Sequence, residues 1–574
     1  MSIQFLSLCG LLCILMSCKE STLEQAPRAL INTASPRLMN QNWSQETRMA
    51  WWFSGQGTRI LPYNWFLALE QPDKSSFIRD PDNLKHYRFI PWPKDSEWNP
   101  DGLPIGFVKD QDAATGQRYF GINCAACHTG KIRSGTQEYL IDGAPAHHDF
   151  DLFLTEIAFA LQKTLDNKEK LARFSIRVLG FHPSLEALEQ LKQQLTEASV
   201  KLGQNILLNH PSLANGYGRF DAFGNMRNAV AVFALNNPAN QVAINAPVSY
   251  PVLWDTPHHD VVQWNGSAVN TGIGPLVRDV QEVIGLFSNF RIEKQTHADL
   301  SVINFNHSIN IPNLKKFQSM LVNLWSPLWS ETQLPAIDNQ LASQGQQLYE
   351  QHCSSCHPLI QREHPLRKIN AKIIPLAEVG TDPLMAANAA THKARTGILE
   401  RESQLPIQKY IANLPKFTAE SLSTDLLNYS AIGVLCENLD QKTLLNGLSE
   451  YLNASTQNRY KPNCQKAQDD NKCLRPVGYK ARPLNGIWAS APYLHNGSVP
   501  NLWELLTPPT KRMRKFNVGS WEFDPIKVGF ITTDEEDTSI FDTSIAGNSN
   551  KGHPWGTDLS ESEKRQLLEF IKTL

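Results

Sequence analysis

The sequence has few charged residues and no long basic run. Lysine, arginine, aspartate and glutamate together make up 19% of the 574 residues, and the formal net charge is −2. Proteins that bind nucleic acid usually carry clustered positive charge that neutralises phosphates, so nucleic acid is not an expected partner. The length allows two or more domains, each with a core of its own.

The apolar run near the N-terminus, Phe5 to Met16, is too short to span a bilayer. The sequence LMSC at residues 15–18 resembles a bacterial lipobox, in which Cys18 would be lipidated after removal of residues 1–17. The n-region lacks lysine and arginine, so an ordinary secretory signal is the alternative. Lys19, in place of an aspartate, favours the outer membrane of a Gram-negative bacterium. Both alternatives predict export to the periplasm.

Cysteine is scarce, with 10 residues in the chain, yet four of them form two Cys-x-x-Cys-His runs. Such a run attaches a c-type haem through two thioether bonds, and its histidine binds the iron. Roughly 0.005 such runs are expected by chance in this composition. The alternative is zinc or redox chemistry, but a zinc site needs a second ligand pair nearby, and neither run has one. The residues of the two runs are Cys124, Cys127, His128, Cys353, Cys356 and His357.

An internal repeat surrounds the two runs. The stretches GQRYFGINCAACH (116–128) and GQQLYEQHCSSCH (345–357) place a glycine, a glutamine and an aromatic residue at the same distances from the first cysteine. Apolar residues at helical spacing predict a helix that begins near Ile337 and includes Gly345. This resembles the helix before the attachment site of cytochrome c domains, and the resemblance implies that the glycine lets a second helix pack closely. That second helix is expected at the C-terminus, where Ser560 and Glu563 form a capping box.

The other cysteines allow a disulfide because an exported chain meets an oxidising compartment. Cys464 and Cys473 flank a polar loop and could pair. Cys436 would then remain as a buried thiol.

The sequence predicts a mainly α fold with two cytochrome c-type haem domains, long loop-rich additions and little β structure. Helices are expected at residues 151–174 and 185–202 from their apolar periodicity. The expected divisions are a signal at 1–17, a loop-rich N-terminal wrap at 18–100, a first haem domain with an insertion at 101–334, and a second haem domain at 335–574.

Three further stretches resemble the di-haem cytochrome c peroxidase superfamily. They are NAPVSYPVLWDTPHHDVVQWNGSA (245–268), YKARPLNGIWASAPYLHNGSVPNLWELL (479–506) and FDTSIAGNSNKGHPWGTDL (541–559). The resemblance covers roughly residues 100–574 and is closest to the large branch that includes the bacterial rubber oxygenase. It implies two covalently bound haem c groups. The first haem would be the reactive one, and the second would deliver electrons from a small periplasmic cytochrome or cupredoxin.

The resemblance also assigns residues to the reaction. His128 and His357 would bind the two irons. Trp264, in a phrase similar to one that the family places between its haems, would carry electrons, with Trp254 as the competing choice. Glu282 occupies the position at which peroxidases of the family hold a glutamate over the reactive iron. A core aromatic and a glutamate on a solvated helix face are the respective alternatives.

Further ligands of the first haem and a calcium site follow from the same resemblance. His147 and His148 lie where some members carry a removable distal histidine, and two surface histidines are the alternative. Calcium between the domains would be bound at the places matched by Asn245, Ser490 and Pro492, since oxygen ligands suit a hard cation.

At the second haem, peroxidases of the family often use a methionine. The corresponding position is near Pro509, where there is none, and Met513 is a few residues late. The resemblance to the large branch implies ligation by two histidines at this haem, with His553 as the distal ligand. It also implies that His495 bonds a haem propionate, as the equivalent residue of the family does. Ligation by two histidines gives a lower potential than ligation by histidine and methionine.

These features predict an exported di-haem oxidoreductase that reduces hydrogen peroxide. One alternative is a dioxygenase, similar to the rubber oxygenase, that uses dioxygen to cleave an apolar polymer or lipid. The other is a non-catalytic electron carrier. A carboxylate beside the first haem favours the peroxidase, and an apolar channel without one favours the oxygenase. The sequence leaves open the organic substrate, the electron donor, the redox potentials and the oligomeric state.

Overall fold

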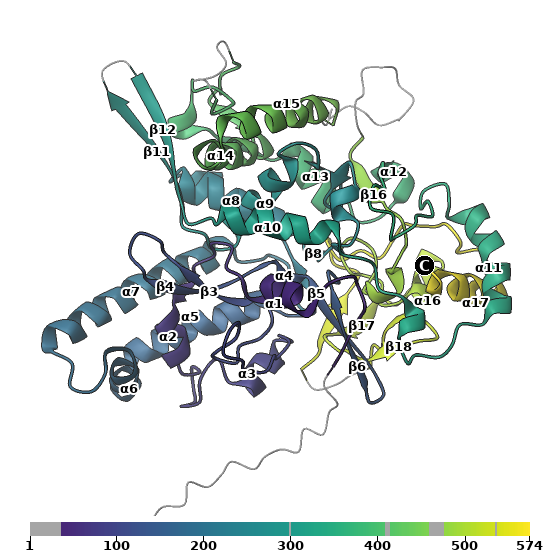
Figure 1. Ribbon diagram of the computed structural model, residues 1–574, viewed down its shortest axis with the longest axis horizontal. Helices are drawn as coiled ribbons and strands as arrows, with labels where there is room; N and C mark the ends of the chain where they lie inside the picture. The colour runs from purple at the N-terminus through teal and green to yellow at the C-terminus, as the bar shows by residue number, and fades with distance from the viewer. Residues whose placement is uncertain (1–35, 298–299, 408–413, 459–475, 534–536) are drawn as a thin grey trace, which may run out of the picture.

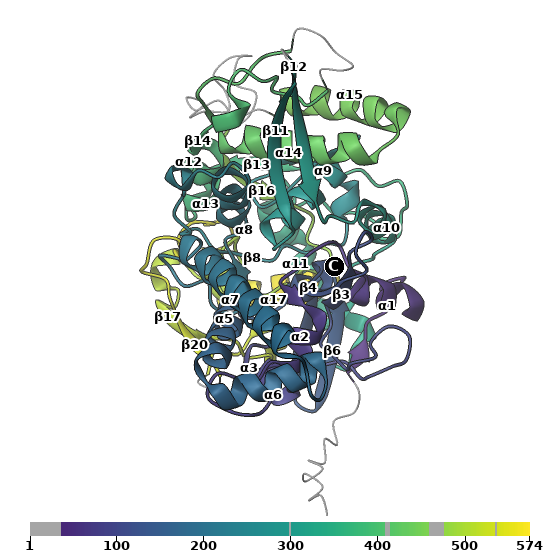
Figure 2. The same cartoon turned by 90° about the vertical axis from the view of Figure 1, so that its left-hand side faces the viewer.

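The computed structural model describes residues 36–297, 300–407, 414–458, 476–533 and 537–574. The predictions for Cys18, Cys464 and Cys473 lie outside these residues. Figures 1 and 2 show a central body of short helices and strands, from which a group of long helices extends on one side. No helix in the described part of the chain is both long and apolar enough to cross a bilayer.

The mainly α prediction with little β structure is wrong. Of the described residues, 41% are helical and 17% are in strands. The strands of the described residues pair in small sheets of two or three strands each. Most of these strands are two to six residues long. An alternating pattern needs about four residues to be recognised, so strands this short leave little trace in the sequence.

The elements have the following bounds. The helices are α1 (Gln45–Phe53), α2 (Tyr63–Ala68), α3 (Pro81–His86), α4 (Cys124–Cys127), α5 (Phe150–Asp166), α6 (Lys168–Leu179), α7 (Leu185–Leu208), α8 (Ala222–Asn228), α9 (Gly274–Gly285), α10 (Ile311–Val322), α11 (Asn339–His352), α12 (Leu376–Val379), α13 (Leu384–Thr391), α14 (Ser423–Asn438), α15 (Gln441–Gln457), α16 (Leu502–Leu505) and α17 (Glu561–Lys572). The strands are β1 (Arg37–Leu38), β2 (Leu61–Pro62), β3 (Phe107–Gln111), β4 (Arg118–Ile122), β5 (Thr129–Ser134), β6 (Gln137–Asp142), β7 (Arg219–Phe220), β8 (Val248–Ser249), β9 (Val261–Val262), β10 (Ala268–Val269), β11 (Phe290–His297), β12 (Leu300–His307), β13 (Lys372–Pro375), β14 (Lys393–Arg395), β15 (Glu420–Leu422), β16 (Gly478–Ala481), β17 (Lys515–Val518), β18 (Phe523–Asp524), β19 (Gly529–Phe530) and β20 (Ser539–Asp542).

The two cysteines of the first Cys-x-x-Cys-His run begin and end α4, and His128 caps its C-terminus. In the chain, α4 lies between β4 of the sheet β2-β4-β3 and β5 of the sheet β1-β6-β5. Asn123 caps α4 by accepting a hydrogen bond from the Ala125 N–H at 3.0 Å. Its amide also donates to the carbonyl oxygens of Trp51 at 2.8 Å and Ser54 at 2.9 Å, around the end of α1. Gly106 lies directly under the run, and a Cβ there would be 2.2 Å from the Ala126 nitrogen. The segment before residue 100 therefore helps to hold the first run.

The second run follows α11, which crosses the C-terminal helix α17. The structure confirms the predicted capping box of Ser560 and Glu563 at the start of α17. It also confirms the close approach at Gly345, where a Cβ would be only 1.9 Å from the Gln566 carbonyl oxygen. The Tyr349 hydroxyl donates to the His357 carbonyl at 2.6 Å and ties the helix to the run.

Replacing Gly345 with alanine is expected to force the two helices apart. Overpacking of this kind costs roughly 1–3 kcal/mol or more of unfolding free energy. The matched control is Gly203→Ala on α7, where a Cβ meets nothing within 4 Å. That change should stabilise the protein by about 0.5–1 kcal/mol, because it only removes the flexibility of a helical glycine. Denaturant unfolding of both variants tests the prediction, and equal effects would contradict it.

The predicted helices of the insertion are present with different bounds. Residues 151–174 do not form one helix, because Asn167 ends α5 and caps α6. The predicted helix at 185–202 continues to Leu208 as α7. The sequence analysis did not anticipate α14 and α15, which lie beside the β11–β12 hairpin in Figure 1.

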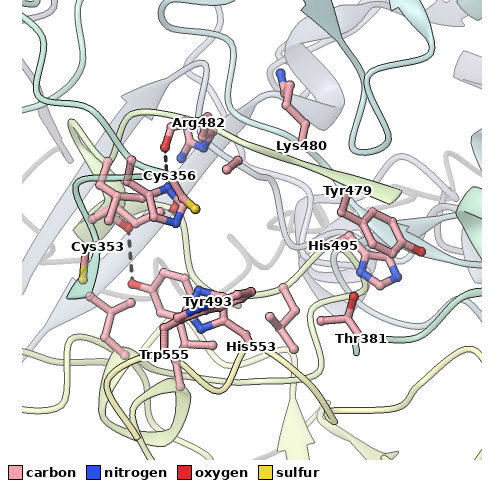
Figure 3. A pocket seen from close by; sticks show the side chains of 18 of the residues that line it. Cys353, Cys356, Thr381, Tyr479, Lys480, Arg482, Tyr493, His495, His553 and Trp555 are labelled. Atoms are coloured by element: carbon pink, nitrogen blue, oxygen red, sulfur yellow. Dashed lines mark hydrogen bonds between the residues drawn. The ribbon is translucent and has the colours of Figure 1, made fainter. Parts of the chain in front are cut away.

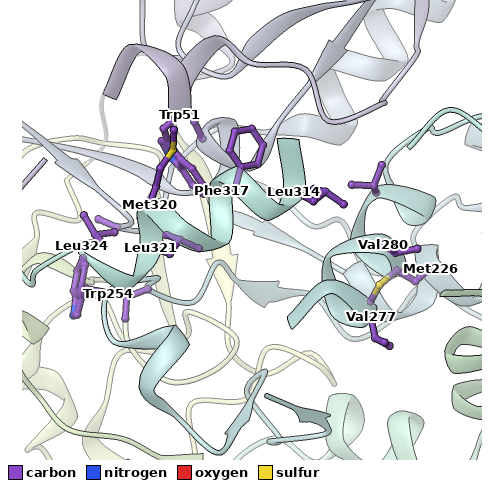
Figure 4. Packing of buried hydrophobic residues seen from close by; sticks show 14 of the residues in the cluster. Trp51, Met226, Trp254, Val277, Val280, Leu314, Phe317, Met320, Leu321 and Leu324 are labelled. Carbon is purple, nitrogen blue, oxygen red and sulfur yellow. The ribbon is translucent and has the colours of Figure 1, made fainter. Parts of the chain in front are cut away.

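Buried residues from both halves of the chain form one large hydrophobic cluster. Figure 4 shows α10 at its centre, with Phe317 and Met320 near Trp51, and Leu324 near Trp254. The ring of Trp51 lies 5.1 Å from that of Phe317 in an edge-on arrangement. The described part of the 18–100 segment contains α1, whose buried apolar residues belong to this cluster, and α2 and α3, whose buried residues belong to a second one. The domain boundaries themselves stay a prediction.

Candidate haem sites

The histidine of the first run is oriented by the backbone of a distant segment. His128 Nδ1 donates a hydrogen bond to the Pro251 carbonyl oxygen at 2.9 Å. This bond fixes the tautomer and leaves Nε2 as the unprotonated nitrogen that a metal requires. Burial lowers the pKa of His128 to about 4, so the ring is neutral at physiological pH.

The second run repeats this arrangement. His357 Nδ1 donates to the Arg482 carbonyl oxygen at 2.6 Å, and burial lowers the pKa of the ring. Each run thus combines two cysteine thiols with a neutral imidazole whose Nε2 is available. This donor set fits a covalently bound haem at both places.

A largely apolar cavity lies beside the second run. Cys353, Cys356 and His357 border it, together with His553 and His495 (Figure 3). The ring centres of His357 and His553 are 6.4 Å apart. A metal–imidazole bond is about 2 Å long, so two imidazoles on one metal have ring centres roughly 6.3 Å apart. The separation in the structure therefore fits the predicted distal role of His553.

His495 lies elsewhere in the same cavity. Its ring stacks on Tyr479 with centres 3.9 Å apart, and burial lowers its pKa to about 3. Its carbonyl oxygen accepts a hydrogen bond from the Ser249 N–H at 2.9 Å. The predicted bond from His495 to a propionate is untested and stays a prediction.

The two histidines after the first run are buried and do not lie on the surface, so the surface alternative is wrong. His148 lies between Phe89 and Tyr250, with ring centres 4.9 and 5.2 Å away, and His147 packs edge-on against Phe530 at 4.3 Å. Neither ring makes a well-formed hydrogen bond to any residue that the structure describes. Burial lowers the pKa of His147 to about 4 and that of His148 to about 3.

Trp264 and the segment 249–251 connect the two sites. Trp264 borders the cavity of the second run, and its Nε1 donates to the Ser249 carbonyl at 2.7 Å. Tyr250 borders the same cavity, while its ring centre is 6.0 Å from that of His128. Trp254, in contrast, is 1% exposed and bonds the Asn485 carbonyl within the hydrophobic cluster. Trp264 thus borders the second site and bonds the segment that also contacts His128, and its role as an electron bridge stays a prediction.

Glu282 lies on α9 and is partly buried. Gln263 donates to its Oε1 at 2.9 Å, so the side chain is not on a solvated helix face. Burial, and then repulsion from Asp279, outweigh the attraction of Arg278 and raise the pKa of Glu282 to about 7. Glu282 is close enough to the first run to affect its electrostatics. Burial, and in addition repulsion from the charge of Glu282, raise the pKa of Cys127 to about 12.

Residues 478–517 match a family model described as RoxA-like, cytochrome c-like. The chain is 30% identical over 594 residues to the uncharacterized protein y4iJ of Sinorhizobium fredii (strain NBRC 101917 / NGR234), and the match covers 93% of each chain. The chain belongs to the y4iJ family. Uncharacterized protein y4iM of the same organism is 33% identical over 136 residues, which cover 19% of this chain and 31% of y4iM.

The match at residues 478–517 indicates the general function of this member of the y4iJ family. Residues 478–517 include Tyr479, Arg482 and His495, which border the cavity of the second run. The protein is therefore a haem c protein with oxidoreductase or oxygenase-like activity.

The residues of the predicted calcium site make the following contacts in the structure. Asn388 donates to Asn245 Oδ1 at 2.9 Å, and the Ser490 hydroxyl donates to the Ile487 carbonyl at 2.9 Å. Pro492 borders the cavity of the second run. No group of three or more histidine, cysteine, aspartate or glutamate residues suitable for a metal occurs in the described ranges. Calcium stays a prediction.

Two residues of the sites were missed by the sequence analysis. Tyr250 lies within the stretch 245–268, and Arg512 lies six residues after the stretch 479–506. Nothing in the local sequence around either residue indicates a role. The contacts of Tyr250 are made with segments more than 100 residues away, at His128 and His148.

Proposed function

We propose that this protein reduces hydrogen peroxide at the first haem, with electrons relayed through the second. The observation that carries the proposal is Glu282. It is a partly buried carboxyl group beside the first Cys-x-x-Cys-His run, with a pKa raised to about 7. A rubber oxygenase-like reaction has no need of such a group, whereas a peroxidase needs an acid and base at this place.

A bound haem supplies the redox chemistry that breaks the O–O bond. Glu282 moves the proton. Its carboxylate takes a proton from the peroxide oxygen that lies nearer to the haem and returns it to the other oxygen, which departs as water. Two electrons and two further protons complete the conversion of one peroxide to two waters. Gln263 holds Oε1, which leaves Oε2 for this transfer. A pKa near 7 lets one group act as base and then as acid at neutral pH.

The surroundings of Glu282 suit a small polar oxidant. A cavity of about 50 Å³ borders Glu282 and Gln263. Gln281, Asn428 and Tyr451 also line it, together with apolar residues that include Phe223, Met226 and Leu427. The Gln281 amide and the Tyr451 hydroxyl both donate to Asn428 Oδ1, at 2.8 and 3.2 Å. This volume accommodates water or peroxide, while a polymer would require a wide apolar channel.

Electrons would enter at the second haem from a small periplasmic cytochrome or cupredoxin. Their route to the first haem would pass through Trp264 and the segment 249–251, whose carbonyls accept hydrogen bonds from Trp264 and His128. Export to the periplasm and a lipid anchor at Cys18, on the outer membrane of a Gram-negative bacterium, complete the proposal.

Replacing Trp264 with phenylalanine should slow the electron from the second haem and leave the initial reaction with peroxide unchanged. Phenylalanine keeps an aromatic ring but loses the bond to Ser249 and the easily oxidised indole. Rapid-mixing absorbance at the band of the reduced second haem measures the step. Trp254→Phe is the control, because Trp254 lies within the hydrophobic cluster. Equal electron-transfer rates in both variants would contradict the bridge.

The RoxA-like match favours a second candidate, an oxygenase that uses dioxygen to cleave an apolar polymer or lipid. Steady-state assays separate the two. The haem-loaded protein is given peroxide and a reduced cytochrome or cupredoxin in one assay, and dioxygen with polyisoprene in the other. Donor oxidation that depends on peroxide supports the proposal. Dioxygen uptake that depends on polyisoprene, with carbonyl products, would replace it with the oxygenase.

A further inference from the structure

Arg512 lies in the segment after α16, and its side chain is 5% exposed. Its guanidinium donates to main-chain oxygens at the end of α16. Nε donates to Glu504 at 3.1 Å and to Thr507 at 3.0 Å, and Nη2 donates to Leu505 at 2.8 Å. These bonds fix one edge of the guanidinium to a helical turn.

The remaining N–H groups of Arg512 reach a different segment, the one that carries His553. Nη1 donates to the carbonyl oxygens of Asn550 at 2.6 Å and Gly552 at 2.9 Å. Nη2 donates to the carbonyl oxygen of His553 itself at 3.2 Å. One planar guanidinium thus joins six carbonyls from two segments that are about 40 residues apart in sequence.

His553 depends on its main chain for orientation. It lies between β20 and α17, in a stretch without regular structure, and its φ is 48°. Its N–H donates to the Val379 carbonyl at 2.7 Å. Its ring Nδ1, by contrast, has no hydrogen-bond partner in the described part of the chain. In most metal-binding histidines, a bond from the second ring nitrogen sets the orientation of the ring. In His553, the orientation of the ring must therefore be set by the hydrogen bonds of its backbone.

We propose that Arg512 is a positioning residue that holds His553 in place as the distal ligand of the second haem. The inference rests on the proposed ligation of that haem by His357 and His553, whose ring centres are 6.4 Å apart. Only arginine has five N–H donors in a planar fork that can serve carbonyls on two sides. Lysine is a point charge with three donors and cannot serve both segments at once.

The test compares electron paramagnetic resonance spectra of the full-length, haem-loaded protein with those of four variants. These are Arg512→Gln, Arg512→Lys, His553→Ala and the control Arg514→Ala, which removes an exposed arginine two residues away. Arg512→Gln should raise the high-spin fraction of the second haem by roughly tenfold or more, as the loss of charge-assisted bonds implies. Arg512→Lys should give a smaller rise, and Arg514→Ala none. Added imidazole should restore the low-spin signal in Arg512→Gln, because the vacated position is open to it.

The first haem serves as the internal standard, since a folded variant keeps its signal. If Arg512→Gln does not load haem, Arg512→Lys decides the question. A low-spin second haem that persists in both Arg512 variants, but not in His553→Ala, would overturn the role of Arg512 alone. A spectrum unchanged in His553→Ala would instead overturn the ligation on which the inference rests.

Discussion

Replacing Glu282 with glutamine should lower the second-order rate constant for peroxide by about 100- to 10,000-fold, the range in which acid–base catalysis usually contributes. Glutamine keeps the shape of the side chain but cannot exchange a proton. Stopped-flow absorbance of the haem-loaded protein at several peroxide concentrations gives the constant. The control is Glu189→Gln, an exposed position on α7, which should react like the wild type.

The pH dependence gives a second, independent test of the same group. The pKa of Glu282 is raised to about 7 by burial, so the carboxylate needed for the first proton transfer forms only as the pH rises through 7. The wild-type rate constant should rise over this range, and that of Glu282→Gln should stay flat. A parallel rise in both proteins would show that another group is responsible.

The stability of the Glu282→Gln variant separates loss of catalysis from loss of structure. Because the folded pKa lies above the unfolded value of 4.5, the stability that Glu282 contributes is full below about pH 4.5. It is lost as the pH rises through 7. Glutamine carries no charge to desolvate. The variant should therefore be at least as stable as the wild type at pH 8, as thermal unfolding would measure.

Replacing Arg48 with methionine should lower the unfolding free energy by about 3–5 kcal/mol, the usual cost of leaving a buried charge without its partner. Arg48 on α1 and Asp142 on β6 form an ion pair at 2.6 Å, and their side chains are 9% and 2% exposed. Trp52 Nε1 donates to the other carboxyl oxygen at 2.9 Å, but it carries no charge. The buried carboxylate then has no cation to balance it.

A double variant and a surface control complete the experiment. Arg48→Met combined with Asp142→Leu should recover most of the lost stability, since both charges are then absent. Arg37→Met removes an exposed arginine from β1 and should change stability by about 0.5 kcal/mol or less. A single Arg48 variant as stable as the Arg37 variant would mean that the Arg48–Asp142 pair does not help to tie α1 to β6. Urea unfolding of each variant provides the free energies.

The sequence supported prediction best where the relevant contacts are local. The two Cys-x-x-Cys-His runs, the helix before the second of them and the capping box of α17 depend on residues within one or two helical turns, so their patterns are visible in the chain. The close approach at Gly345 was expected from the resemblance to cytochrome c domains. The repeated glycine of the first half does not share it, because Gly116 precedes strand β4 and a Cβ there would meet nothing within 4 Å.

The remainder depends on contacts between distant segments. The strands are too short to show a pattern, and the break at Asn167 comes from a cap within an apolar stretch. Pairs such as Arg48 and Asp142, or Arg512 and Asn550, lie 94 and 38 residues apart. The burial of His148 follows from its packing between Phe89 and Tyr250. Neither partner adjoins it in the sequence.

The most direct test of the proposed function is a single-turnover reaction of the haem-loaded protein in which only the second haem is reduced. The protein is mixed rapidly with one equivalent of hydrogen peroxide, and the absorbance band of the reduced second haem is followed. The proposal predicts loss of that band at a rate that depends on peroxide concentration, and a much slower loss in Glu282→Gln. A band that persists in wild-type protein while peroxide remains unconsumed would contradict peroxide reduction as the function of this chain.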